Sequence, residues 1–166
     1  MEIYPRSKWS KDRAPRDLTS QSPRNVREMF LHYPAASQRL NGIDRDQEQV
    51  QYMRAIRDFH MDTRGWDYFA YTHAVFQDGE VYQGRGIGHI PAAQEGHNTN
   101  TFAVLCVLGN TESPSFAMRS ALVRLKNHYD HYAHRDLTAK PHSAATATSC
   151  PGDKLRAFIP ELNRKA

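Results

Sequence analysis

The sequence predicts a single α/β domain in which a central mixed β-sheet is flanked by helices. Strand-like and helix-like patterns alternate along the chain, and a continuous apolar run at residues 101–108 is typical of a fully buried strand. Asp78-Gly79 lies between two extended segments and is a strong hairpin signal. A chain of 166 residues, 39% of them hydrophobic, has the size of one domain and is long enough to bury a core.

Residues 1–25 form an extended, turn-rich lead-in that we expect to pack on the body of the domain. Trp9 is the one large side chain available to fasten it. We therefore assign residues 1–166 to one domain. A short strand over residues 26–31 follows and leads into His32, and regular structure stops at Pro34.

From Asp44 the pattern changes to an amphipathic helix of about four turns, with apolar residues at three-residue steps. Extended segments at residues 68–76 and 80–83 flank the predicted hairpin turn, and a loop over residues 84–100 precedes the buried strand. The helix is marked by Val50, Met53, Ile56 and Phe59.

A second helix begins near Ser113-Pro114, where serine can cap the helix and proline can occupy its first turn. A short extended piece at residues 137–141 and a loop rich in Thr, Ser and Ala come next. A last short helix starts at Pro151. The second helix carries the apolar residues Phe116, Leu122, Val123, Leu125 and Tyr129.

The net charge of +4 and the pI near 9.2 favour contact with polyanions, but the basic residues are scattered singly along the chain. Without a basic cluster interleaved with aromatic residues, we expect no nucleic-acid partner. The sequence has no run of about 18 apolar residues, and residues 1–6 lack the apolar stretch of a secretory signal. We therefore expect no membrane anchor and no signal peptide.

Three residues have the chemistry of a zinc site. His32 ends a predicted strand, and His142 and Cys150 lie eight positions apart across a loop. Cys150 stands at the mouth of the predicted last helix, and a helix N-terminus favours the thiolate, which is the form that binds metal. Zinc sites with three protein ligands keep a fourth position for water, which is typical of catalytic zinc.

Other hydrolase motifs are absent from the sequence. There is no His-Glu-x-x-His helix, no second cysteine pair and no Gly-x-Ser-x-Gly motif. Cys150 acting as a nucleophile with His142 as its base is an alternative. Cys106 lies inside an apolar run and is interpreted as a small buried hydrophobic residue.

Several segments, spread over nearly the whole chain, together resemble the superfamily of type 2 N-acetylmuramoyl-L-alanine amidases and peptidoglycan recognition proteins, which includes many phage endolysins. They are Tyr4-Pro5-Arg6-Ser7-Lys8-Trp9, Phe30-Leu31-His32-Tyr33, Arg64-Gly65-Trp66, Val81-Tyr82-Gln83-Gly84-Arg85-Gly86, Gly96-His97-Asn98 and Thr148-Ser149-Cys150-Pro151-Gly152.

The resemblance implies one zinc ion held by His32, His142 and Cys150. It further implies hydrolysis of the amide bond between N-acetylmuramic acid and L-alanine in bacterial peptidoglycan. We expect a monomer that is made in the cytoplasm and acts on the cell wall in phage-induced lysis. A non-catalytic peptidoglycan receptor on the same fold is the alternative; such members usually lack the cysteine ligand, which is present here.

The resemblance also assigns other roles. Tyr71 matches the catalytic tyrosine, and Thr148 stands where it can help orient the water or the developing charge. His97 and Asn98 lie in the loop expected to contact substrate. His73 or His97 is a candidate proton donor to the leaving amine.

The chain departs from the family pattern at several positions. The residue before the catalytic tyrosine is Ala70 instead of glycine, and Ala93 replaces a loop histidine, so that a substrate contact is either missing or supplied by His97. Leu105 occupies the position where some members carry a glutamate base. His134 begins a segment like the family's second ligand motif, but it lies sixteen positions before Cys150, and only His142 has the family's spacing of eight.

Overall fold

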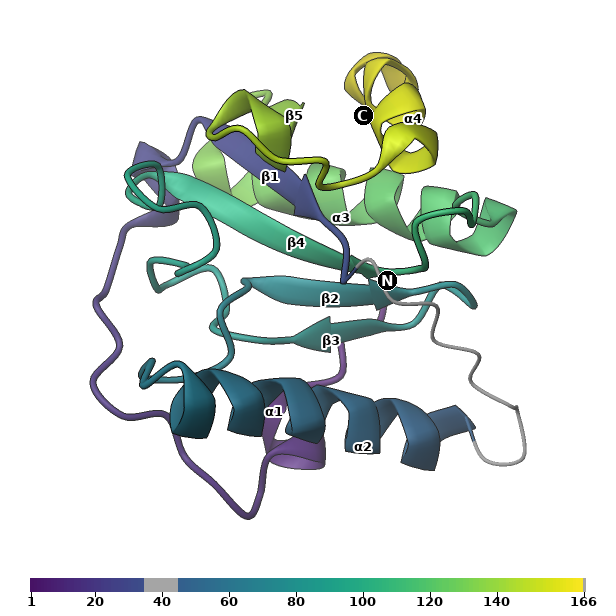
Figure 1. The fold of residues 1–166 in the computed structure, drawn as a ribbon. Coiled ribbons are helices and arrows are strands. Elements are labelled where there is room, and N and C mark those ends of the chain that lie inside the picture. The colour runs from purple at the N-terminus through teal and green to yellow at the C-terminus, as the bar shows by residue number, and fades with distance from the viewer. Residues whose placement is uncertain (35–44, 166) are drawn as a thin grey trace.

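The computed structural model describes residues 1–34 and 45–165, which form one sheet with helices on both faces. The strand order is β3-β2-β4-β1-β5 (Figure 1). Neighbouring strands β2, β4, β1 and β5 run parallel, and β3 pairs antiparallel with β2, so the predicted mixed sheet is confirmed. The strands are β1 (Glu28–His32), β2 (His73–Phe76), β3 (Val81–Gln83), β4 (Thr101–Val107) and β5 (Thr138–Pro141).

The helices lie in two layers, with α1 and α2 on one face of the sheet and α3 and α4 on the other (Figure 1). A π-helical turn, Phe59–Thr63, extends α2, and 3-10 turns occur at Pro23–Asn25 and His142–Ala144. The helices are α1 (Arg6–Trp9), α2 (Arg45–Asp58), α3 (Phe116–Ala133) and α4 (Asp153–Lys165).

Strand β4 is buried along its whole length because helices cover both of its faces. Val104 and Cys106 belong to the core under α3 and α4, while Leu105 and Val107 belong to the core under α2. Cys106 is fully buried, in agreement with its interpretation as a hydrophobic residue.

The lead-in is tied to the hairpin by Trp9, which is fully buried. Its indole Nε1 donates to the carbonyl of Gln83 at 2.8 Å, and the backbone N–H of Tyr4 donates to Val81 at the same distance. The segment is not wholly extended as predicted, since it contains the one-turn helix α1. Beyond that helix, Arg57 of α2 pairs with Asp12.

Several predicted boundaries were wrong for local reasons. Ser115, and not Ser113, caps α3, because its Oγ accepts from the N–H of Met118 at 2.9 Å. The last helix starts at Asp153 instead of Pro151, because Gly152 between them has φ of +81° and cannot be helical. The predicted start of α2 at Asp44 lies outside the described residues.

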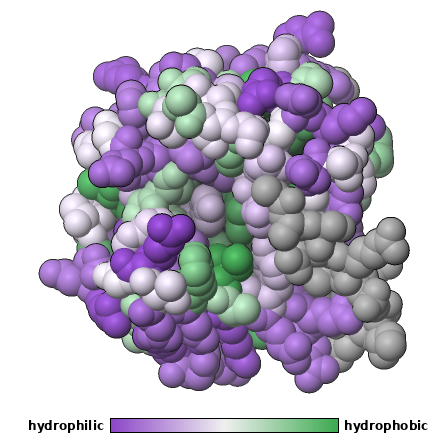
Figure 2. All heavy atoms as spheres, viewed as in Figure 1, coloured by the Kyte–Doolittle hydropathy of each residue, from purple (hydrophilic) through white to green (hydrophobic). Residues whose placement is uncertain are grey.

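The extended segment predicted at residues 68–76 is regular only from His73. The cavities that indent the surface include one beside the 92–98 loop and one between α3 and α4. Figure 2 shows hydrophilic residues over most of one face and apolar residues gathered near its centre. None of the helices in the described ranges combines the length and the apolar character needed to span a bilayer.

Candidate metal centre

The fold brings His32, His142 and Cys150 into one cluster. His32 is the last residue of β1, and His142 directly follows β5, the parallel neighbour of β1, so both histidines lie at the same edge of the sheet. One ligand atom from each of the three residues falls within 4.8 Å of the others. His32 Nδ1 is 3.9 Å from the Sγ of Cys150, and the ring centroids of His32 and His142 are 4.3 Å apart.

The donor set fits zinc. Two imidazole nitrogens and one sulfur are preferred zinc ligands, and atoms held tetrahedrally at normal bond lengths lie roughly 3.3–3.6 Å apart. The cluster therefore needs only a small contraction to bind the ion. His134 is not part of it: this exposed residue caps the end of α3 with φ of 55°, and its ring lies 6.5 Å from that of His131.

His32 is 2% exposed and has one ring nitrogen already engaged. Its Nε2 lies 2.9 Å from Oε1 of Gln94, which is itself fully buried. Burial, followed by the nearby His142, lowers the pKa of His32 to about 3. The imidazole is therefore neutral at physiological pH, which is the form that ligates metal.

Cys150 departs from expectation. Without metal, burial raises the pKa of its thiol to about 11, although the Tyr33 N–H at 3.4 Å and the Arg156 guanidinium act in the opposite direction. The prediction that Cys150 stands at the mouth of the last helix was wrong, because α4 begins only at Asp153. The sulfur therefore gains little from the helix N-terminus, and it is desolvated. The metal-free thiol is thus protonated, and a metal ion would have to displace this proton on binding.

Tyr71 stands beside the cluster, with its ring edge-on to His32 at 5.2 Å between centroids. The segment before it is held by His60 of the π-helical turn, whose Nδ1 accepts from the Ala70 N–H at 3.1 Å. Burial raises the pKa of Tyr71, so its hydroxyl keeps its proton at neutral pH. Tyr71 can therefore act as a hydrogen-bond donor close to a bound metal.

A cavity of about 530 Å³ opens beside the cluster and shares His142 with it. Trp66 forms part of the wall, held by a bond from its backbone N–H to the carbonyl of His60 at 2.9 Å. We call this cavity the cleft. Its lining residues are Trp66, Ala92, Ala93, Glu95, Asn98, His142 and Thr146.

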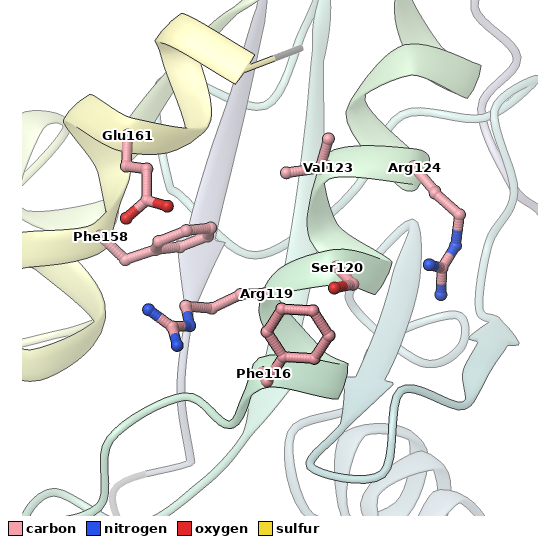
Figure 3. Close-up of a pocket in the computed structure, with 7 residues that line it drawn as sticks. All are labelled: Phe116, Arg119, Ser120, Val123, Arg124, Phe158 and Glu161. Atoms are coloured by element: carbon pink, nitrogen blue, oxygen red, sulfur yellow. The ribbon is translucent and has the colours of Figure 1, made fainter.

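The second cavity, about 460 Å³, lies between α3 and α4 (Figure 3). Phe158 and Glu161 of α4 stand opposite Arg119 and Val123 of α3 there. Its described lining residues include no histidine and no cysteine.

The other predicted site residues take different positions. Thr148 Oγ1 accepts from the N–H of Cys150 at 3.2 Å, so Thr148 lies next to the cluster. Asn98 lines the cleft, but its Oδ1 accepts from the N–H groups of Ala93 and Gln94, each at 3.0 Å. His97 is exposed and is not among the residues that line the cleft. The catalytic and substrate roles of these residues stay predictions.

Two further expectations concern acid–base groups. Leu105 pairs in register with His32, so a nonpolar side chain occupies the place nearest the cluster on β4. His73, a candidate proton donor, is 3% exposed, lies 2.7 Å from the hydroxyl of Tyr129 on α3 and is not among the residues that line the cleft, so the structure does not support that role.

Sequence reasoning missed Gln94. Its contact with His32 joins residues 62 positions apart, and a glutamine in a loop carries no signal of such a role. Only the folded arrangement identifies it as the partner of His32.

Known proteins resemble the chain over about three fifths to nearly all of its length. An N-acetylmuramoyl-L-alanine amidase of Sus scrofa is 38% identical over 111 residues, covering 62% of this chain and 18% of that protein. Peptidoglycan recognition protein 1 of Mus musculus is 28% identical over 162 residues, covering 95% of this chain and 85% of the mouse protein. The homologues of this chain are thus amidases and peptidoglycan recognition proteins. No protein-family model matches the chain.

Solved structures show the same fold. The bumblebee peptidoglycan recognition protein SA superposes with a TM-score of 0.83 at 26% identity, covering 96% of this chain and 93% of that one. A Drosophila peptidoglycan recognition protein LB mutant in complex with tracheal cytotoxin gives 0.81 at 26% identity, with 95% and 92% covered. The chain spans about a fifth of the length of the mammalian amidases it matches.

Proposed function

We propose that this protein hydrolyses the amide bond between N-acetylmuramic acid and L-alanine in bacterial peptidoglycan, with one zinc ion held by His32, His142 and Cys150. The observation that supports this most directly is the convergence of two imidazoles and a thiol within 4.8 Å beside an open cleft. Three protein ligands leave one coordination position for water, as catalytic zinc sites require. The amidases among the homologues agree with this reaction.

Zinc bound in such a site polarises a carbonyl and lowers the pKa of its water to about 7. The protein's own residues supply the rest. Tyr71, beside His32, donates a hydrogen bond from its hydroxyl to the oxygen that becomes negatively charged when the amide carbonyl is attacked. Thr148, which already accepts from the Cys150 amide, keeps its own hydroxyl hydrogen for the water or the same oxygen.

The cleft is the proposed place of the stem peptide. A homologous recognition protein was solved with tracheal cytotoxin bound, and the cleft here has the volume to hold several residues of a peptide. Trp66 provides a rigid aromatic wall and Asn98 a polar one. Asn98 has its Oδ1 committed to the loop, so its Nδ2 is the group left to contact substrate.

The same proposal includes a lytic role of the endolysin type, in which the protein is made in the cytoplasm and reaches the wall at lysis. Incubation of permeabilised bacteria with the purified protein tests it, since release of stem peptides must be followed by loss of turbidity. Intact turbidity despite cleavage of isolated peptidoglycan would rule out this role while leaving the amidase activity in place.

The decisive experiment is a product assay on purified peptidoglycan together with measured zinc content. The wild type should release new alanine N-termini without new reducing sugars. Cys150→Ser and His142→Ala should lose zinc and activity, whereas the matched change His134→Ala should keep both, because His134 lies at the end of α3.

Other outcomes would favour a different function or a different set of zinc ligands. Tight peptidoglycan binding without products would mean that the protein is a receptor on the same fold. New reducing sugars would indicate a glycosidase, and loss of zinc in His134→Ala with retention in His142→Ala would overturn the ligand set.

A further inference from the structure

We infer that Gln94 is a positioning residue that fixes the tautomer of His32, so that Nδ1 and not Nε2 is the nitrogen presented to the metal. The inference rests on the proposed zinc site and concerns how that site is built. Gln94 is fully buried, His32 is 2% exposed and Thr101, the next residue in the network, is 5% exposed. Water therefore has little access to these groups, and they must satisfy one another.

The direction of the hydrogen bonds follows from two backbone carbonyls. The Thr101 Oγ1 lies 2.8 Å from the carbonyl oxygen of Asn98 and 3.0 Å from that of His97. A carbonyl oxygen can only accept, so the single hydroxyl hydrogen of Thr101 is committed to them. Toward any other partner, Thr101 Oγ1 can offer only a lone pair.

That other partner is the Gln94 carboxamide, whose nitrogen lies 2.8 Å from Thr101 Oγ1. Because Thr101 must accept, Gln94 has to present its NH₂ group on this side. The orientation of the carboxamide is thereby determined, and its oxygen faces His32 at 2.9 Å.

The carboxamide oxygen can only accept, so Nε2 of His32 must carry the ring hydrogen. A neutral imidazole carries a single ring hydrogen, and Nδ1 is left with a free lone pair. Nδ1 is the nitrogen 3.9 Å from Cys150 Sγ, in the cluster. The network therefore aims the lone pair at the position where a metal would be shared with Cys150.

The loop that contains Gln94 is closed on itself. Asn98 Oδ1 accepts from the backbone N–H of Gln94, and the Asn98 carbonyl accepts from Thr101. The predicted substrate residue Asn98 thus also supports the residue that orients His32. Partners of this kind, which hold a ligating histidine by its second nitrogen, typically contribute 10- to 100-fold to metal affinity.

The test combines a tautomer measurement with a zinc affinity. Long-range ¹H–¹⁵N correlation spectra of the metal-free protein should show His32 as the Nε2–H tautomer. In Gln94→Leu the acceptor is lost, and the dissociation constant for zinc, measured by chelator competition, should rise by about 10- to 100-fold.

Gln49→Leu is the matched control. Gln49 is also a buried glutamine with two side-chain partners, Asp78 and Tyr82, but it lies on α2. Its loss should reduce stability while leaving the His32 tautomer and the zinc affinity unchanged.

An Nδ1–H tautomer in the metal-free wild type would overturn the inference, as would unchanged zinc affinity in a folded Gln94→Leu. The spectrum of the wild type decides the tautomer even if that variant does not fold. Failure of the proposed function has different signs: a wild type that binds no zinc, or binds it without cleaving peptidoglycan, leaves the tautomer result standing.

Discussion

Tyr71 illustrates how much a single side chain depends on its neighbours. The residue precedes β2, and its ring lies against both His32 and Phe69. Its backbone carbonyl accepts from the N–H of Arg85 at 2.9 Å. The hydroxyl is thus presented by a segment fixed from both sides, which is what donation to a developing charge requires.

Replacing Tyr71 with phenylalanine removes only the hydroxyl. We expect Tyr71→Phe to lower kcat by about 100-fold, the usual effect of losing one donor to an oxyanion, with zinc affinity unchanged. Rates on purified peptidoglycan and chelator competition measure the two quantities. A variant with full activity would remove Tyr71 from the mechanism, and one that loses zinc would show that its role is structural.

The sequence was most informative about single residues where few residue types can perform the required chemistry. His32, His142 and Cys150 were selected because few residue types bind zinc and because His142 and Cys150 have the eight-residue spacing of the family that the sequence resembles, and the structure groups the three residues within 4.8 Å. Gln94 was not identified, since hydrogen bonding by a glutamine is common and its partner lies far away in the chain. The burial that raises the pKa of the Cys150 thiol could not be predicted from the sequence, because burial is a property of the fold.

Gly84 shows what an element boundary requires. It directly follows β3, and a Cβ placed on it would lie 2.3 Å from the carbonyl oxygen of Tyr71 and 2.6 Å from the ring of Phe69. The chain can pass so close to the segment before β2 only because this residue has no side chain. The close approach therefore couples the hairpin to Tyr71.

We expect Gly84→Ala to destabilise the protein by about 1–3 kcal/mol, because backbone atoms must move to admit the methyl group. Activity should fall as well, since one of the displaced atoms belongs to Tyr71. Gly88→Ala is the matched control, because a Cβ there meets nothing within 4 Å. Urea unfolding and rate measurements compare the two, and equal stabilities would contradict the prediction.

The elements themselves were largely predictable, and their ends were not. The buried β4 and the helix α3 have strong patterns of apolar residues, so their existence followed from the sequence. The shorter β2 began later than predicted, and α4 began after Gly152. Such ends depend on backbone geometry and on contacts with distant segments.

The stability of the whole molecule depends on pH through a histidine buried in its core. Burial, followed by the nearby His128, lowers the pKa of His73 to about 3 from a usual value near 6.5. Below pH 6.5 the unfolded chain takes up a proton at His73 that the folded protein does not accept until about pH 3. The free energy of unfolding is therefore undiminished by His73 above pH 6.5, and it decreases as the pH falls from 6.5 towards about 3.

His73→Asn offers a non-titrating partner to the hydroxyl of Tyr129. Between pH 7 and pH 5 the wild type should lose on the order of 2 kcal/mol more unfolding free energy than this variant. Urea denaturation at the two pH values gives the difference. Equal losses in both proteins would show that His73 does not carry this dependence.

The sheet order has a consequence for the timing of events in the cell. β1 lies between β4 and β5, and His32 is separated from Cys150 by 118 positions. A nascent chain that has emerged only as far as β4 contains a single member of the metal-binding trio. Capture of a metal ion by all three residues must then follow synthesis of the chain through Cys150, so that a loaded site would report that β1, β4 and β5 have already come together.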